Sequence, residues 1–321
     1  MSPAVVVIVE NTLQALYTGL VLGCVYGLMC VGLALIFSVM RVINFAQGEF
    51  LMLGMYAALF VFAQLGISAL LGPYVGPIVA AVLGGAIVFG VGIAAYEGLL
   101  RWITGLEVAG TEGEGHYPQL TLTLGLSLLL SNGGLIVFGS EPQTMRTPMS
   151  SNAWELGPLF GSDITLFLNQ ARSLASVVAL AVAAAVALFI ARTRLGKMLR
   201  AAADNPEAAT YMGIHVGRAY RLAFGIGAAV TAIAGGLVAT YYPFQPYIGI
   251  EFVIVMYAGV VLGGMGSVGG AFWGGLTIGL IQQLSTLVLP NQLQNAAIFV
   301  AFLLIVLLRP QGLFGRSVER V

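Results

Sequence analysis

Three long segments of this chain carry no charged side chain: residues 50–96, 222–250 and 252–308. Hydrophobic residues make up 59% of the 321 residues and charged residues only 8%, whereas a soluble domain carries about 25% charged residues. A helix that crosses a bilayer takes about 20 residues, so the third segment is long enough for two or three crossings. The sequence therefore predicts an all-α, polytopic helical membrane protein.

The apolar runs and the breaks between them predict eight to nine transmembrane helices, some of them interrupted or re-entrant. No basic region of the kind found in signal peptides precedes the first run, so we expect that run to remain as a span. No polar stretch is long enough for a soluble domain, and residues 1–321 are expected to form a single transmembrane domain. The candidate spans are approximately 12–40, 49–66, 75–100, 119–139, 172–193, 219–241, 250–263, 269–289 and 294–308.

The basic residues gather in one loop, which predicts how the chain is oriented. Six of the thirteen lysines and arginines lie in residues 192–221, and three more lie in the tail from Arg309 to Val321. The positive-inside rule places both segments in the cytoplasm. Residues 140–171, rich in acidic residues and prolines, are then expected to form an ordered external loop. The segment 101–118 falls inside by alternation, although its own charge is acidic.

Within the basic loop the sequence predicts a short capped helix. Asp204 or Asn205 is placed as its N-cap, Pro206 in its first turn, Glu207 for a capping contact, and Gly213 as its stop. Such a helix can be a simple connector between two spans or an element that docks on a partner. The loop by itself leaves both interpretations open.

Asn44, Gln47 and Glu49 stand in an otherwise apolar stretch. Asn44 followed by Gln47 forms a variant of the capping box, which predicts a helix start there, and Glu49 suits the positive end of a helix. The alternative is that the three side chains line a wet path. A charged residue at the bilayer centre costs about 2.5–3.5 kcal/mol on insertion scales, so Glu49 requires a partner or water.

The segment around Glu49 has a counterpart in the second half of the chain. Residues 49–57 read E-F-x4-M-Y-A, and residues 251–258 read E-F-x3-M-Y-A. Each follows residues that interrupt helices, and such pairs of interrupted segments point to substrate sites in transporters. We therefore expect a two-fold internal repeat with Glu49 and Glu251 on the substrate path, although so short a match can also arise by chance.

Several kinds of catalytic site are excluded by sequence. A P-loop requires G-x4-G-K-[ST], and the single lysine, Lys197, is followed by methionine, so this chain cannot bind ATP in that way. The glycines of 263–270 match G-x-G-x-x-G, but no strand precedes them, and a break between two helices explains them better. His116 and His215 have no ligand at metal-site spacing. We expect no metal, no cofactor and no nucleic-acid partner for this chain.

Four segments, in their order and spacing, resemble the permease subunits of the branched-chain amino acid class of ABC importers. They are residues 42–54, V-I-N-F-A-Q-G-E-F-L-M-L-G; residues 196–214, G-K-M-L-R-A-A-A-D-N-P-E-A-A-T-Y-M-G-I; residues 262–275, L-G-G-M-G-S-V-G-G-A-F-W-G-G; and residues 309–315, R-P-Q-G-L-F-G. The second contains E-A-A-x3-G, the form of the loop through which ABC-importer permeases engage their ATPases.

The resemblance implies a non-enzymatic, multi-pass subunit of the bacterial inner membrane, in contact with lipid. Its implied partners are a second homologous permease, two cytoplasmic ATPases that bind the ATP and Mg, and a periplasmic binding protein. It also implies a cytoplasmic coupling loop at about 194–218. The residues expected to couple to the ATPases are Arg200, Asp204, Asn205, Pro206, Glu207, Ala208, Ala209 and Gly213.

Relatives in this family carry leucine, isoleucine and valine, other amino acids, urea, short amides or aromatic acids, and the binding protein largely selects among them. We expect a branched-chain or other apolar amino acid, with urea, amides or aromatic acids as the alternative. Gln47 stands where the family commonly has histidine, which bears on the substrate. A proton-coupled secondary transporter using Glu49 and Glu251 is a further alternative, but it leaves the capped basic loop without a function.

Overall fold

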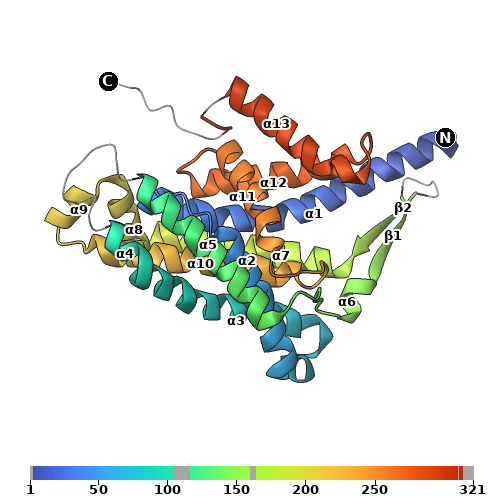
Figure 1. Ribbon diagram of the computed structural model, residues 1–321. Coiled ribbons are helices and arrows are strands. Elements are labelled where there is room, and N and C mark those ends of the chain that lie inside the picture. The colour runs from blue at the N-terminus through green and yellow to red at the C-terminus, as the bar shows by residue number, and fades with distance from the viewer. Residues whose placement is uncertain (1–2, 105–115, 160–163, 310, 314–321) are drawn as a thin grey trace.

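The computed structural model describes residues 3–104, 116–159, 164–309 and 311–313. Long helices dominate it (Figure 1). They are α1 (Pro3–Met40), α2 (Gln47–Gln64), α3 (Ile67–Ala95), α5 (His116–Phe138), α7 (Gln170–Arg192), α10 (Val216–Val238), α11 (Ile248–Gly263), α12 (Val268–Ser285) and α13 (Gln294–Leu308). The shorter helices are η1 (Tyr96–Leu100), α4 (Arg101–Thr104), α6 (Pro148–Ser151), α8 (Arg194–Asp204), α9 (Pro206–Tyr211) and η3 (Asn291–Leu293).

Each predicted span coincides with one of the long helices. Among the described residues, five helices are long and apolar enough to cross a membrane, and α11 with α12, bent by 120° at their junction, gives a sixth if the pair counts as one span. The chain is therefore a polytopic helical membrane protein, as predicted. The five helical segments are Val5–Met40, Ala69–Ile103, Pro118–Phe138, Gln170–Arg192 and Val216–Val238.

The expectation of an all-α chain is wrong in one place. The loop predicted to be external, residues 140–171, contains an antiparallel hairpin of β1 (Ala153–Leu159) and β2 (Ile164–Asn169). The side chain of Gln14 in α1 bonds the edge of β2, because its Nε2 donates to the Phe167 carbonyl at 2.8 Å and its Oε1 accepts from the Phe167 amide at 3.1 Å. The described part of the loop is ordered, as predicted, and is anchored to the first helix.

Glycines let α1 pack closely against α12. Gly19, Gly23 and Gly27 recur at every fourth position of α1, and a methyl group at Gly23 would lie 2.6 Å from the carbonyl oxygen of Leu276. Small residues at this spacing are typical of close helix packing in membranes. Gly19 lies against Leu280, whereas Gly27 lies against Phe272, so α12 runs antiparallel to α1.

The two ends of the molecule differ in charge. Figure 1 shows their elements, with α8 and α9 at one end and β1 and β2 at the other. We name them the basic end, where α8 and α9 lie, and the hairpin end, where β1 and β2 lie. Among described residues, the basic side chains of the hairpin end are Arg146 and Arg172, and those toward the basic end are Arg41, Arg101, Arg192, Arg194, Lys197, Arg200, Arg218, Arg221 and Arg309. The acidic part of 101–118, at 105–115, and the tail beyond 313 lie outside the described residues.

Candidate translocation path and coupling loop

The chain between α1 and α2 turns back into the protein. Gly32 of α1 and Gln47 of α2 both lie against Gly227 and Thr231 of α10. The fourteen residues between them therefore lead away from this part of α10 and return to it. Arg41, directly after α1, has a φ of 54°, a left-handed conformation that is uncommon for residues other than glycine. The α2 helix therefore begins in the interior of the molecule.

The predicted capping box at Asn44 is not formed. The α2 helix begins at Gln47 with Ala46 at the N-cap position, and Asn44 Oδ1 accepts a hydrogen bond from the Ala46 amide at 3.1 Å. Asn44 Nδ2 donates to Gln47 Oε1 at 2.9 Å, and Gln47 Nε2 in turn donates to Thr231 Oγ1 at 2.5 Å and to the Gly227 carbonyl at 3.2 Å. The amide of Gln47 thus ties α2 to the middle of α10 instead of closing its own helix.

Glu49 is buried in the first turn of α2. Ser127 of α5 donates a hydrogen bond to its Oε1 at 3.2 Å, whereas Oε2 has no hydrogen-bond partner in the described part of the chain. The residue is only 1% exposed. A carboxylate in this position has the positive end of the helix as its nearest electrostatic support.

The N-termini of α2 and α11 meet inside the protein. A methyl group on Gly249 would lie 2.8 Å from the carbonyl carbon and oxygen of Gly48, and 2.9 Å from Glu49 Oε2. From this junction α2 runs along α10, since Gln47 contacts Thr231 and Ala58 approaches Gly236. The α2 helix therefore starts where α11 also starts and leads away from it along α10.

The α11 helix instead follows α1. Tyr26 packs on Phe252 with 6.2 Å between ring centroids, and Cys30 lies against the Met256 carbonyl. Because α1 and α10 are antiparallel across Gly32 and Gly227, α11 leads toward the basic end and α2 toward the hairpin end.

The second glutamate, Glu251, has a different environment from Glu49. It also lies in the first turn of its helix, but its side chain is exposed and lines a polar cavity of about 550 Å³ at the hairpin end. The structure therefore places the two predicted path residues near one helix junction without bringing their carboxylates into the same site. The cavity itself was not predicted from the sequence.

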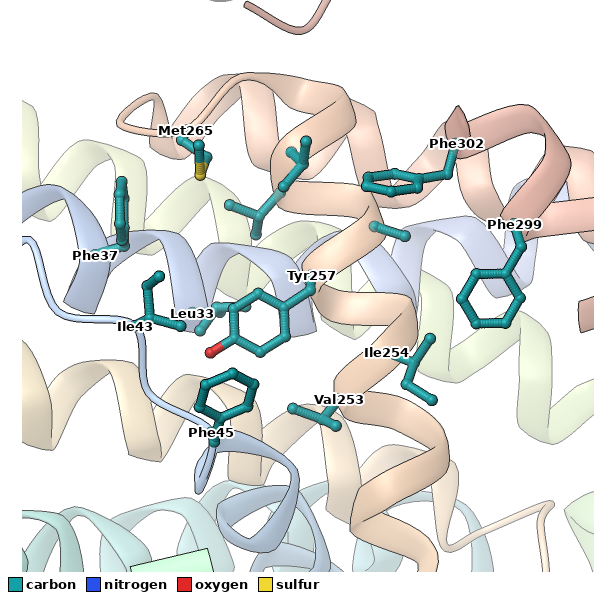
Figure 2. Close-up of a pocket in the computed structure, with 13 residues that line it drawn as sticks. Leu33, Phe37, Ile43, Phe45, Val253, Ile254, Tyr257, Met265, Phe299 and Phe302 are labelled. Carbon is teal, nitrogen blue, oxygen red and sulfur yellow. The ribbon is translucent and has the colours of Figure 1, made fainter. Parts of the chain in front are cut away.

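A separate apolar pocket of about 420 Å³ lies between α1, residues 43–45, α11 and α13. Figure 2 shows the rings of Phe45 and Tyr257 next to each other in its wall, with 5.5 Å between their centroids. The Tyr257 hydroxyl is buried and has no hydrogen-bond partner among the residues that the structure describes. This aromatic contact links the segment between α1 and α2 to α11. It lies on the basic-end side of the junction of α2 and α11.

The capped helix of the basic loop is α9, and its caps are as predicted. Asn205 is the N-cap, with its Oδ1 accepting from the Ala208 amide at 2.9 Å, and Pro206 is the first helical residue. Gly213 has a φ of 81°. Its amide donates to the Thr210 carbonyl at 3.0 Å, and the next amide donates to the Ala209 carbonyl at 2.9 Å, which is the Schellman arrangement.

The side chains of the other predicted coupling residues of this loop take no part in the caps of α9. Asp204 ends α8 and is exposed, and Glu207 is exposed and makes no side-chain hydrogen bond within the described residues, so its predicted capping contact is not formed. Ala209 packs inward, whereas Ala208 faces solvent. Arg200 of α8 reaches back to the Ala191 carbonyl at 3.2 Å, which fixes α8 to the end of α7.

The tip of the loop exposes apolar surface. Tyr211 is 88% exposed and Met212 81% exposed, directly before the Gly213 stop. Large apolar side chains in such exposure are typical of a surface that docks on a partner. The sequence contained this signal, because both residues interrupt an otherwise polar and small-residue loop, but neither was among the predicted coupling residues.

Ser127 and Thr231 were also missed by the sequence prediction. Each is a polar residue in the middle of an apolar helix, which is the one local signal of a buried hydrogen bond. Across the described ranges, no group of three or more His, Cys, Asp or Glu side chains could hold a metal ion.

Comparisons with known proteins agree with this architecture. The chain matches the family described as branched-chain amino acid transport system / permease component over residues 15–308. It is 29% identical over 311 residues to the high-affinity branched-chain amino acid transport system permease protein LivH of Escherichia coli K12, covering 96% of this chain and 97% of that protein. It is also 29% identical over 317 residues to BraD, the permease protein of the same description from Pseudomonas aeruginosa, covering 98% and 99%.

A more distant relative comes from an archaeon. The probable branched-chain amino acid transport permease protein LivH of Methanocaldococcus jannaschii is 28% identical over 265 residues, covering 81% of this chain and 76% of that protein. No solved structure matches the chain. The family match spans nearly all of the described helices and confirms the resemblance carried by the four sequence segments. The chain belongs to the permease-component family of branched-chain amino acid transport systems.

Proposed function

We propose that this permease forms the membrane path of an ATP-driven importer in a bacterial inner membrane and carries a branched-chain or other apolar amino acid. The relatives from Escherichia coli and Pseudomonas aeruginosa are high-affinity branched-chain amino acid permease proteins, which supports this substrate class over urea, amides or aromatic acids. The basic end is cytoplasmic in this proposal, as the positive-inside rule requires. Helices α2, α11, α12 and α13 then complete a bundle of eight to nine membrane segments.

The proposed path passes the junction of α2 and α11. Asn44 and Gln47 fix the start of α2 to α10 at this junction, and Glu49 and Glu251 supply charge beside it. Interrupted helices that begin at mid-depth and run in opposite directions are typical of substrate sites between inverted repeats. The junction is also the place where a small shift of either helix changes access, because the two backbones touch through glycines.

The observation that carries the proposal is the α9 loop at the basic end. Its backbone is fixed at both ends by Asn205 and Gly213, and it presents Tyr211 and Met212 to solvent. A rigid element with an exposed apolar tip can transmit movement of a partner to the membrane helices. We assign that partner as one of two ATPases, which hold the ATP and Mg, and the remaining partners as a second permease and a periplasmic binding protein.

Purification from bacterial membranes tests this assignment. The chain purified alone is expected to hydrolyse no ATP, because it has no P-loop. Purified from its native membranes, it is expected to bring two P-loop ATPases and a second permease with it. A chain that transports its substrate alone, without these subunits, would contradict the proposal.

A further inference from the structure

We infer that the polar cavity at the hairpin end is a binding site for a free α-amino acid in its zwitterionic form. This inference rests on the proposed function and assigns a place where the substrate first binds this chain. The cavity measures about 550 Å³, within the range of roughly 300–1,000 Å³ of small-molecule sites. It is lined by Leu22, Tyr26, Arg172, Val238, Tyr241, Tyr242, Glu251, Phe252, Val255, Gln282, Gln283, Thr286, Gln294 and Asn295.

The cavity holds one positive and one negative side chain that are not paired. Arg172 comes from the start of α7 and Glu251 from the start of α11. The two salt bridges of the described residues both belong to Glu97, at the basic end, so neither cavity charge is neutralised by a protein partner. A ligand that carries one ammonium and one carboxylate group supplies a partner for each.

The remaining polar groups add directional contacts. Gln282 Oε1 is buried without a hydrogen-bond partner in the described chain, and it can accept from an ammonium group. The guanidinium carbon of Arg172 lies 5.5 Å from the centre of the Tyr241 ring, which orients the guanidinium on its aromatic face. An oriented guanidinium binds a carboxylate through two parallel hydrogen bonds.

One wall of the cavity is apolar and rigid. Phe252 makes edge contacts with Tyr26 at 6.2 Å and with Tyr242 at 6.0 Å, and these contacts fix its ring between α1 and the turn after α10. Val255 and Leu22 extend the same wall. An aliphatic side chain fits here, while the α-ammonium and α-carboxylate groups reach the charged residues.

The charge pattern separates the candidate substrates by their chemistry. Urea and short amides are neutral and leave both Arg172 and Glu251 without a counter-charge. An aromatic acid neutralises Arg172 but places its carboxylate in a cavity that also holds Glu251. An apolar amino acid satisfies both charges and the apolar wall, so we assign this class to the cavity.

The cavity also lies next to the proposed path. Glu251 is two residues after Gly249, whose backbone touches Gly48 at the junction of α2 and α11. A substrate bound at Glu251 is therefore one helical turn from the place where the interrupted helices meet. Because Glu251 is in the first turn of α11, binding of the substrate can shift the N-terminus of this helix directly.

A labelling experiment on the assembled transporter in liposomes tests this site. Cys24 and Cys30 are replaced by alanine, and Thr286→Cys places a thiol on the cavity wall. Free leucine is expected to slow the reaction of this thiol with a water-soluble reagent. The analogues 4-methylpentanoate, without the ammonium group, and 3-methylbutylamine, without the carboxylate, are expected to protect far less. Ser151→Cys, exposed at the same end outside the cavity, is the control and should not be protected.

Charge variants complete the test. Arg172→Gln and Glu251→Gln should each raise the leucine concentration for half-protection about tenfold, since each removes a charged hydrogen-bond partner. Arg172→Lys and Glu251→Asp keep the charges and should retain most of the protection, which separates binding from folding. Glu141→Gln and Arg146→Gln, exposed at the same end, are the matched charge controls and should change nothing.

Three results would overturn the inference: no protection by leucine, equal protection by all three compounds, or protection that the Arg172→Gln and Glu251→Gln variants leave unchanged. ATP-driven uptake of leucine by the same liposomes reports on the proposed function separately. Uptake without protection at Thr286→Cys removes the site and leaves the function, whereas protection without ATP-driven uptake removes the function and leaves the site.

Discussion

At the scale of single residues, the interior of this permease depends on a few hydrogen bonds between distant segments. Gln47 and Thr231 are the main example, with 2.5 Å between Nε2 and Oγ1 across 184 positions of sequence. Both side chains are fully buried. The sequence predicted that Gln47 was important, but assigned it to its own helix, because local patterns carry no information about a partner so far away.

Gln47→Leu should destabilise the permease by about 1–3 kcal/mol, because it leaves a buried Asn44 amide and the Gly227 carbonyl without their partner. Thermal unfolding of the purified protein in detergent measures this loss. Gln64→Leu, at the exposed end of the same helix, is the matched control and should have little effect. Equal melting temperatures for the two variants would show that the Gln47 hydrogen bonds contribute nothing.

At the scale of elements, the helices were largely predictable and their tertiary relations were not. Apolar runs and the breaks between them located every long helix, and α9 was predicted with its N-cap and stop because Asn205, Pro206 and Gly213 act within a few residues of each other. The β1–β2 hairpin was missed, and its contact with Gln14 of α1 spans 153 positions, which no local pattern indicates. The polar cavity was missed because six separate elements contribute to it.

The junction of α2 and α11 leads to a prediction about helix contact. Gly249→Ala adds a methyl group 2.8 Å from the Gly48 backbone, which should force the two helices apart at a cost of about 1–3 kcal/mol. Transport should fall further than stability, because the junction is on the proposed path. Gly90→Ala in α3, where nothing lies within 4 Å, is the control and should be tolerated in both assays.

The α9 loop leads to a prediction about coupling. Gly213→Val places a β-branched residue at a φ of 81°, which costs about 1–2 kcal/mol and should distort the stop of the helix. The variant should insert normally but lose transport and retain less ATPase on the purified complex. Gly217→Val, at an open position without positive φ, is the control. Normal transport by Gly213→Val would mean that the loop is only a connector.

At the scale of the whole molecule, charge and helix direction give the permease two distinct ends. Most of the described basic residues lie toward α8 and α9, while the hairpin and the polar cavity occupy the opposite end. The interrupted helices α2 and α11 meet between them. In the proposed function, this order corresponds to a substrate entrance, a junction that opens, and a docking surface along one axis.

The energy source for uptake is the most direct test of this account. Liposomes that contain the complete complex, with the binding protein outside and ATP inside, are expected to accumulate radiolabelled leucine, and a protonophore should not change the rate while ATP is held constant. Non-hydrolysable ATP should stop uptake. Leucine uptake that follows an imposed pH gradient in the absence of the ATPase subunits would contradict the assignment as an ABC permease.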